Sequence, residues 1–330
     1  MTDALYITSD ETRGLATAGE YVEAVREGYR QVGAGAPAEP RTQLTGRDPP
    51  GLLTAYIAIL PETGAMGGYT YAAGFGDRDA HFVTPLFDAE SGAPLAVLDG
   101  AHMNPYKTGA VGAVGTDVLA RPDATTLAMI GSGSQARGQL RAIDAVRELE
   151  RVDVYSPTKE NRESFASEMN GEVAPTVAAV ASSAAAIGGA DIVVTATNAR
   201  EPVFDGDCLD PGAHVTAMGN YTPGRRELDD TTVARATYVL DLRARADRDA
   251  ASLMAAIENG AVDEAHVHGD LGEILVGDVP GRTDDDEITV FDSGGTAIET
   301  VAAAHLLYKR AREHGLGEPL PFAPASEAME

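Results

Sequence analysis

One short segment of this chain combines glycines and hydroxyls at a spacing that points to a specific chemistry. Gly131-Ser-Gly-Ser-Gln-Ala136 fits the pattern G-x-G-x-x-A, and it lies between the apolar run 126–130 and a helix-forming stretch. In that context, Gly131 permits a tight turn and Gly133 lets backbone N–H groups approach a pyrophosphate at the positive end of a helix. Ala136 allows the helix to pack close to the strand. The segment therefore predicts a dinucleotide-binding turn.

The residues after the next apolar strand distinguish between the two nicotinamide dinucleotides. NAD-binding proteins usually place Asp or Glu there, about 20 residues after the glycines, to bind a ribose hydroxyl. This chain has Ser156 at that position, and Asp153 lies earlier in the strand. Thr158, Lys159 and Arg162 add a hydroxyl and two cations, which suit a phosphate group. The sequence therefore predicts NADP(H) in preference to NAD(H).

The charge of the chain excludes several classes of function. Its 330 residues include 51 acidic and only 25 basic ones, so the formal net charge is −26. This charge repels nucleic acids and anionic membranes, and we expect neither as a partner. Self-repulsion destabilises a compact state in dilute buffer but is screened at high salt. Because lysine occurs only at Lys107, Lys159 and Lys309, the composition predicts a halophilic protein.

The sequence also predicts a cytoplasmic protein without a disulfide or a metal. Neither a signal peptide nor an apolar stretch of membrane-spanning length is visible. Cys208 is the single cysteine, which excludes an internal disulfide framework and a cysteine cluster. His266 and His268 lack a third ligand at a recognisable spacing.

Hydrophobic patterning predicts two kinds of architecture along the chain. Residues 18–32 have helical periodicity, residues 33–50 are typical of a loop, and short apolar runs over residues 52–98 indicate an antiparallel sheet. After a helix over residues 107–119, strands and helices alternate, which is typical of a doubly wound parallel sheet. A last helix over residues 295–312 is expected to return to the first domain. We predict an α/β protein in which a Rossmann domain, residues 121–304, is inserted into an α+β domain of residues 1–120 plus 305–330.

Several further segments together resemble the ornithine cyclodeaminase/μ-crystallin family. The resemblance covers residues 41–307, and Tyr155-Ser-Pro-Thr-Lys-Glu-Asn161 is similar to the stretch of μ-crystallin that holds the NADPH phosphate. The matching segments are residues 85–92 and 94–100, Lys107-Thr-Gly-Ala110, residues 131–136, Gly212-Ala-His-Val215, Arg226-Glu-Leu-Asp-Asp230, Leu271-Gly-Glu273 and Phe291-Asp-Ser-Gly-Gly295.

The resemblance implies a homodimer with its active site between a substrate-binding, dimerising domain and the Rossmann domain. It also implies hydride transfer between a nicotinamide and the carbon of a C–N bond in a small anionic imino or amino acid. The cofactor-binding residues expected from the motif and the resemblance are Thr108, Gly131, Ser132, Gly133, Ser134, Gln135, Ala136, Ser156, Thr158, Lys159, Arg162, Thr197, Gly219, Ser293 and Gly295.

The chain departs from the family pattern at the residues expected to do chemistry. Tyr69 stands where active members usually carry a Lys, Tyr221 where cyclodeaminases carry an Asp, and Thr54 near an extra Glu of those enzymes. Lys107 replaces an Arg, whereas Arg41 matches an Arg that contacts the substrate carboxylate.

Because cyclodeamination needs a carboxylate base, these replacements argue against it. Tyrosines are adequate proton donors, so Tyr69 or Tyr221 is expected to donate the proton during reduction of an imine. Arg41 and Lys107 are expected to hold the carboxylate, and Lys107 to lower the pKa of a neighbouring tyrosine. The sequence thus predicts an NAD(P)H-dependent imine or ketimine reductase. An ornithine cyclodeaminase or alanine dehydrogenase, and a non-catalytic NADPH-binding protein, remain alternatives.

Overall fold

The computed structural model describes residues 2–75, 79–218 and 224–329. The chain forms two compact units, of which the first joins Met1–Lys107 to Thr296–Glu330 and the second is Thr108–Gly295. The chain therefore leaves the first unit inside helix α2 (Met103–Leu119) and returns immediately before helix α9 (Ala297–His314). Both crossings precede the boundaries expected near residues 120 and 304, because residues 108–119 of α2 belong to the second unit and the whole of α9 belongs to the first.

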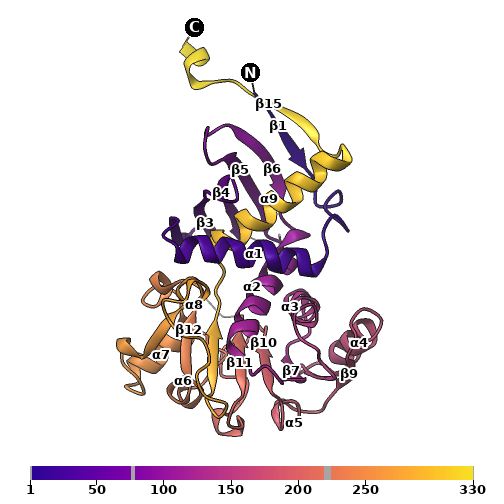
Figure 1. Ribbon diagram of the computed structural model, residues 1–330, viewed down its shortest axis with the longest axis vertical. Helices are drawn as coiled ribbons and strands as arrows, with labels where there is room; N and C mark the ends of the chain where they lie inside the picture. The colour runs from indigo at the N-terminus through magenta and orange to yellow at the C-terminus, as the bar shows by residue number, and fades with distance from the viewer. Residues whose placement is uncertain (1, 76–78, 219–223, 330) are drawn as a thin grey trace. The chain divides into compact units, whose positions relative to one another are not determined.

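The first unit contains a seven-stranded sheet in the order β15-β1-β6-β5-β4-β3-β2. Its neighbouring strands are antiparallel except for β1 and β6, which are parallel. Helices α1 (Ala18–Gly33) and α9 cover one face of this sheet (Figure 1). The strands are β1 (Thr2–Ile7), β2 (Ala38–Arg47), β3 (Pro50–Leu60), β4 (Ala65–Ala73), β5 (His81–Asp88), β6 (Pro94–Asp99) and β15 (Glu318–Phe322), and a short 3₁₀ turn, η4 (Ala325–Met329), follows.

Alternation along β3 determines which side chains face the two helices. Thr54, Tyr56 and Leu60 are buried beneath them, whereas Ile57 between them points to the other face and is 62% exposed. The helices approach closely at Gly28, where a Cβ would lie only 3.2 Å from Cγ2 of Ile298. The expected helix over residues 18–32 and the expected antiparallel sheet are thus present.

The predicted loop over residues 33–50 is wrong, because most of it is strand β2. This strand lies at the edge of the sheet and, among the described strands, pairs with β3 alone. Most of its residues are exposed, so it lacks the apolar alternation by which strands are recognised from sequence. Exposed polar and charged residues are typical of an edge strand, since they discourage pairing with another chain.

The second unit is built on an eight-stranded parallel sheet in the order β13-β12-β14-β11-β10-β7-β8-β9. The chain runs outward from β7 to β9 and then returns to β10 to build the other half, which is the predicted doubly wound arrangement. The strands are β7 (Thr126–Ile130), β8 (Arg151–Tyr155), β9 (Thr176–Ala179), β10 (Ile192–Thr195), β11 (His214–Ala217), β12 (Thr237–Leu240), β13 (Val267–Asp270) and β14 (Thr289–Asp292).

Helices connect these parallel strands (Figure 1). A core of buried apolar side chains joins several strands to α5, α6 and α7. The helices are α3 (Ser134–Asp144), α4 (Lys159–Met169), α5 (Ser183–Ile187), α6 (Asp230–Arg235), α7 (Ala251–Glu258) and α8 (Leu271–Val276), with 3₁₀ turns η1 (Gly206–Cys208), η2 (Arg243–Arg245) and η3 (Glu264–His266). Among the described residues, no helix is both long and apolar enough to cross a membrane.

Candidate functional site

The glycine-rich turn after β7 has the backbone that its sequence predicts. Gly131 has φ +123°, and a Cβ there would lie 2.3 Å from the carbonyl oxygen of Ala196. Only glycine fits this position without strain. Gly133 is the N-cap of α3 and offers no side-chain cap, and nothing lies within 4 Å of a Cβ built there. The first N–H groups of α3 thus receive no side-chain cap from Gly133, and the positive end of the helix suits an anion.

Two features that the sequence did not indicate stabilise this turn. Arg137 donates from Nη1 to the carbonyl oxygen of Ser132 at 2.6 Å and pairs through Nη2 with Glu168 at 2.7 Å. On the adjacent part of α2, Gly109 packs so closely on α3 that a Cβ would lie 2.1 Å from the carbonyl oxygen of Gly138. Gln139 donates from Nε2 to the carbonyl oxygen of Thr108 at 2.8 Å, which places that predicted cofactor residue against α3.

The end of β8 lies beside this turn, as a cofactor-binding strand must. Ser132 donates its hydroxyl to Oγ of Ser156 at 2.9 Å, and Ser156 donates in turn to the carbonyl oxygen of Thr158 at 3.3 Å. Arg162 donates from Nη1 to the carbonyl oxygen of Ser156 at 2.9 Å. Asp153 is buried inside β8, and its carboxylate already pairs with Arg151.

Lys159 opens helix α4 in an exposed position. Its Nζ lies 3.7 Å from a carboxylate oxygen of Glu163, one turn further along the helix. An exposed pair of this kind contributes little stability, so the ammonium remains accessible to a phosphate group.

The loop after β10 is held by the carboxylate of Glu227, which the sequence did not indicate as a site residue. Glu227 is buried, and its Oε1 accepts from the backbone N–H of Thr197 at 2.7 Å and from the Thr197 hydroxyl at 2.6 Å. Its Oε2 accepts from the hydroxyl of Thr195 at 3.0 Å. Burial raises the pKa of Glu227 to about 7, and the negative charge of Asp292 adds to the effect. The predicted cofactor residue Thr197 therefore has its hydroxyl proton directed toward Glu227.

The turn after β14 is held in a similar way. The Ser293 side chain is buried and donates its hydroxyl to Oδ2 of Asp241 at 3.0 Å. Gly295 donates its backbone N–H to the same oxygen at 3.1 Å. Gly219 and Tyr221, which the sequence also placed at the site, lie outside the described residues.

The predicted residues of the second unit therefore gather at one edge of its sheet. The turns that carry Gly131, Ser156, Thr197 and Ser293 follow β7, β8, β10 and β14, and the carboxyl ends of parallel strands meet at one edge. This edge is where doubly wound folds bind their ligands.

In the first unit, the sheet face beneath the helices carries a cluster of rings and cations. Tyr69 and Tyr56 are paired across β4 and β3, with their ring centroids 5.7 Å apart. The guanidinium of Arg41 lies 5.1 Å from the centroid of the Tyr56 ring, and Nζ of Lys107 lies 5.1 Å from that of Tyr69. The hydroxyl of Tyr69 donates to Oδ1 of Asn104 at 3.0 Å. The structure thus brings together the three residues predicted for this unit, Arg41, Tyr69 and Lys107.

Lys107 is tied to a second buried carboxylate. Its Nζ lies 3.3 Å from Oε1 of Glu299, with both side chains almost fully buried. Glu299 also accepts from the backbone N–H and hydroxyl of Thr296, at 2.7 and 2.6 Å, and from the hydroxyl of Tyr29 at 3.0 Å. These four donors surround the buried carboxylate of Glu299, as a buried ion pair requires.

Two buried hydroxyls on the same face make no hydrogen bond within the described structure. They belong to Thr54, which pairs with Tyr71, and to Thr84. A Cβ at Gly100 would lie 3.1 Å from Oγ1 of Thr84 and 3.3 Å from Cε2 of Tyr69. Because buried polar atoms are rarely left unsatisfied, these hydroxyls are suited to bind a ligand.

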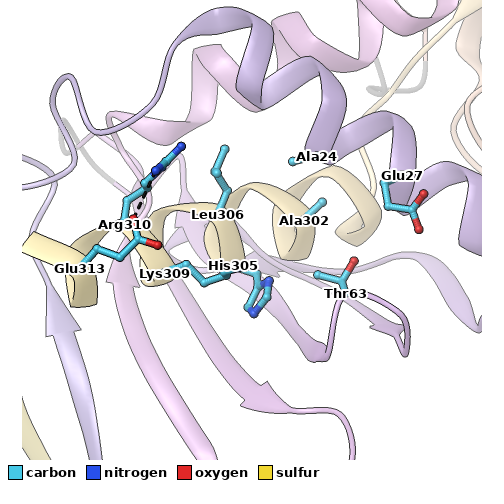
Figure 2. A pocket seen from close by; sticks show the side chains of 9 residues that line it. All are labelled: Ala24, Glu27, Thr63, Ala302, His305, Leu306, Lys309, Arg310 and Glu313. Carbon is cyan, nitrogen blue, oxygen red and sulfur yellow. Dashed lines mark hydrogen bonds and ion pairs between the residues drawn. The ribbon is translucent and has the colours of Figure 1, made fainter.

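A separate groove of about 310 Å³ lies between α1 and α9 (Figure 2). Its lining includes both cations and carboxylates, among them Glu27, Lys309 and Glu313. Arg310, which also lines the groove, pairs with Glu313 at 3.2 Å. None of the predicted site residues lines it.

The described residues contain no cluster of three potential metal ligands. His214 has a structural role. It is fully buried between the hydroxyls of Thr289 and Thr216, and burial lowers its pKa to about 3.

Comparison with known proteins gives a consistent set of relatives. The profile of the ornithine cyclodeaminase/mu-crystallin family matches residues 5–315. A Delta(1)-pyrroline-2-carboxylate reductase of Bacillus cereus is 36% identical over 267 residues, which cover 81% of this chain and 79% of that protein. The Delta(1)-pyrroline-2-carboxylate reductase of Thermococcus litoralis, solved with NADH and L-proline, has a TM-score of 0.91 at 31% identity and covers 96% of this chain and 100% of its own. An archaeal alanine dehydrogenase dimer with bound NAD has a TM-score of 0.90 at 29% identity, with coverage of 98% and 100%.

Proposed function

Because the chain belongs to the ornithine cyclodeaminase/mu-crystallin family, we propose that it is an NAD(P)H-dependent reductase acting on the C=N bond of a small imino acid. The observation that carries this proposal is the turn after β7, where Gly131 has a positive φ and the first turn of α3 is uncapped. This backbone fits the pyrophosphate of a dinucleotide, which supplies a hydride when bound.

The end of β8 supports NADP(H) as the preferred cofactor. Ser156 occupies the place of the acidic residue that binds the ribose in NAD-binding proteins, and the carboxylate of Asp153 is paired with Arg151. Lys159 and Arg162 follow within one helical turn of α4 and carry the positive charge that a 2′-phosphate requires.

The substrate half of the site is assigned to the ring-bearing face of the first unit. Arg41 and Lys107 supply two buried cations for a carboxylate, with exposed fractions of 7% and 4%. Tyr56 and Tyr69 surround them with flat apolar surface, and the hydroxyls of Thr54 and Thr84 add hydrogen-bonding groups. This combination suits a compact cyclic imino acid, in which a carboxylate is attached directly to a ring.

Reduction of a C=N bond also needs a proton on the nitrogen. Tyr69 is the residue of this face that we assign as the donor, because its hydroxyl proton is oriented by Asn104 and its ring lies beside the ammonium of Lys107. Tyr221 remains the second candidate for this step.

We assign dimerisation to the opposite face of the same sheet. This face exposes Leu53, Ile57 and Val83, and it contains an apolar groove of about 370 Å³ lined by Ile59, Phe87 and neighbouring residues. Exposed apolar surface of this kind marks a protein interface. The similar archaeal alanine dehydrogenase is a dimer.

Oxidation of NADPH, followed by its absorbance, tests the proposed activity. The substrate panel is Δ1-pyrroline-2-carboxylate, its six-membered homologue, iminosuccinate, and pyruvate with ammonia, each assayed in dilute and in concentrated salt. We expect the cyclic imines to be reduced fastest. Turnover only with pyruvate and ammonia would assign the alanine dehydrogenase activity instead. NADPH binding in calorimetry without turnover on any substrate would indicate a non-catalytic binding protein.

A further inference from the structure

A buried charge cluster in the second unit surrounds Arg245, and the formation of a parallel sheet does not require it. Arg245 is 1% exposed. Its Nη1 donates to Oδ1 of Asp241 at 2.5 Å and its Nε to Oδ1 of Asp249 at 2.6 Å. Its Nη2 lies 3.6 Å from Oδ1 of Asp292. Three carboxylates thus surround one guanidinium, and such a cluster costs more in desolvation than a packed apolar core would.

The cluster is directed at one turn of the chain, Ser293-Gly294-Gly295, which follows β14. A single oxygen, Oδ2 of Asp241, accepts from the hydroxyl of Ser293 and from the N–H groups of Gly294 and Gly295, at 3.0, 3.0 and 3.1 Å. The guanidinium of Arg245 lies against the same turn, because a Cβ at Gly294 would be 2.0 Å from Nη2. The conformation of the turn is therefore determined by Asp241 and Arg245 together.

The position of the turn suggests its purpose. It lies at the carboxyl edge of the sheet, as do Gly131 and Ser156, but in the other half of the strand order, beyond β10 and β11. In a doubly wound sheet, a dinucleotide extends across the point where the strand order reverses, with its adenosine at the first half. The turn therefore belongs to the half that receives the nicotinamide.

We propose that Asp241, supported by Arg245, is a positioning residue that holds the Ser293–Gly295 turn in the shape required by the nicotinamide half of the cofactor. This proposal rests on the proposed function. Asp241 acts through the main chain of the turn and does not itself contact the cofactor. A turn that is already held in shape loses less conformational entropy when the cofactor binds. Removing the hydrogen bonds from Asp241 to the turn should therefore weaken the affinity for the whole dinucleotide more than the affinity for its adenosine fragment.

Two matched variants separate this role from a purely structural one. Asp241→Asn and Asp249→Asn each remove one carboxylate charge from Arg245, and of the two it is Asp241 whose carboxylate the described structure shows accepting hydrogen bonds from the turn. The dissociation constants of NADPH and of 2′,5′-ADP are measured by calorimetry for the wild type and both variants, together with their thermal unfolding. Asp241→Asn should weaken NADPH binding about tenfold, corresponding to one charged hydrogen bond, and leave 2′,5′-ADP binding unchanged. Asp249→Asn should leave both constants within about twofold of the wild type.

The outcomes distinguish failure of the positioning role of Asp241 from failure of the proposed function. Equal weakening of both ligands by Asp241→Asn, or equal weakening of NADPH by both variants, would overturn the positioning role. If the wild type binds neither ligand, the proposed dependence on NADP(H) itself fails. Should Asp241→Asn not fold, Ser293→Ala removes one donor of the same turn, and unchanged NADPH affinity in that variant would also count against the proposal.

Discussion

Glu227 allows the electrostatics of the second unit to be tested by a single substitution. Its carboxylate is buried, accepts three hydrogen bonds from Thr195 and Thr197, and has a pKa raised from 4.5 to about 7, mainly by burial. Glu227→Gln keeps the shape and most of the hydrogen bonding but cannot ionise. The variant therefore isolates the effect of the buried negative charge on the free energy of unfolding.

The direction of the effect follows from proton binding. Below pH 4.5 the group is protonated in both the folded and the unfolded chain, and above about pH 7 it is ionised in both. Between these values the folded protein holds a proton that the unfolded chain has lost, so Glu227 makes the free energy of unfolding fall as the pH rises. Each pH unit corresponds to about 1.4 kcal/mol. From pH 5.5 to pH 7 and above, the wild type should therefore lose about 2 kcal/mol that Glu227→Gln retains.

Denaturant unfolding between pH 5.5 and pH 8.5, at constant salt, measures this difference. We expect the stability of Glu227→Gln relative to the wild type to rise with pH by about 2 kcal/mol and to level off above pH 7. Glu201→Gln, at an exposed position, controls for the loss of one unit of net charge. A difference between Glu227→Gln and the wild type that does not change with pH would show that the buried carboxylate does not titrate in this range and would refute the reasoning.

Four further predictions concern the assigned residues and the net charge. Tyr69→Phe should lower kcat for imine reduction by about 10²-fold with little change in KM, and unchanged kcat in steady-state kinetics would remove Tyr69 as the proton donor. Ser156→Asp should weaken NADPH relative to NADH by at least about tenfold in calorimetry, and an unchanged ratio would mean that Ser156 does not face the ribose. Ile57→Glu should shift the protein from dimer to monomer in light scattering, whereas an unchanged mass would place the interface elsewhere. Raising the salt from about 0.1 M to about 2 M should raise the Tm because it screens the self-repulsion, and a Tm independent of salt would contradict the halophilic interpretation.

The elements that the sequence predicted correctly are those specified by local patterns. The turn at Gly131 is recognisable because a positive φ next to a buried strand requires glycine, and the periodicity over residues 18–32 reports the buried side of α1 directly. The fold class and the family could be predicted because several such segments occur in a fixed order along the chain. The edge strand β2 was missed for the opposite reason, since its exposed residues leave no periodic pattern.

The positioning carboxylates were missed because their partners are distant in sequence. Glu227 lies 32 residues from Thr195, Asp241 lies 52 residues from Ser293, and Glu299 lies 192 residues from Lys107. Nothing local distinguishes Glu227 and Asp241 from the other acidic residues of the chain, and the capping box of Thr296 and Glu299 at the start of α9 indicates a helix start but not the contact with Lys107. Tertiary packing alone shows that each is buried and surrounded by donors.

The difference between exposed and buried carboxylates changes how the acidic composition is interpreted. Most of the 51 acidic residues act through their summed charge, which salt screens. Glu227, Asp241 and Glu299 act through short hydrogen bonds inside the protein, where salt does not reach, and each fixes a residue that the site is expected to use. A high salt concentration should therefore relieve the surface repulsion without weakening the groups that shape the site. We therefore predict that the exposed carboxylates act through their summed charge and the buried ones through the geometry of the proposed anion-binding site, because the two sets are separated by burial.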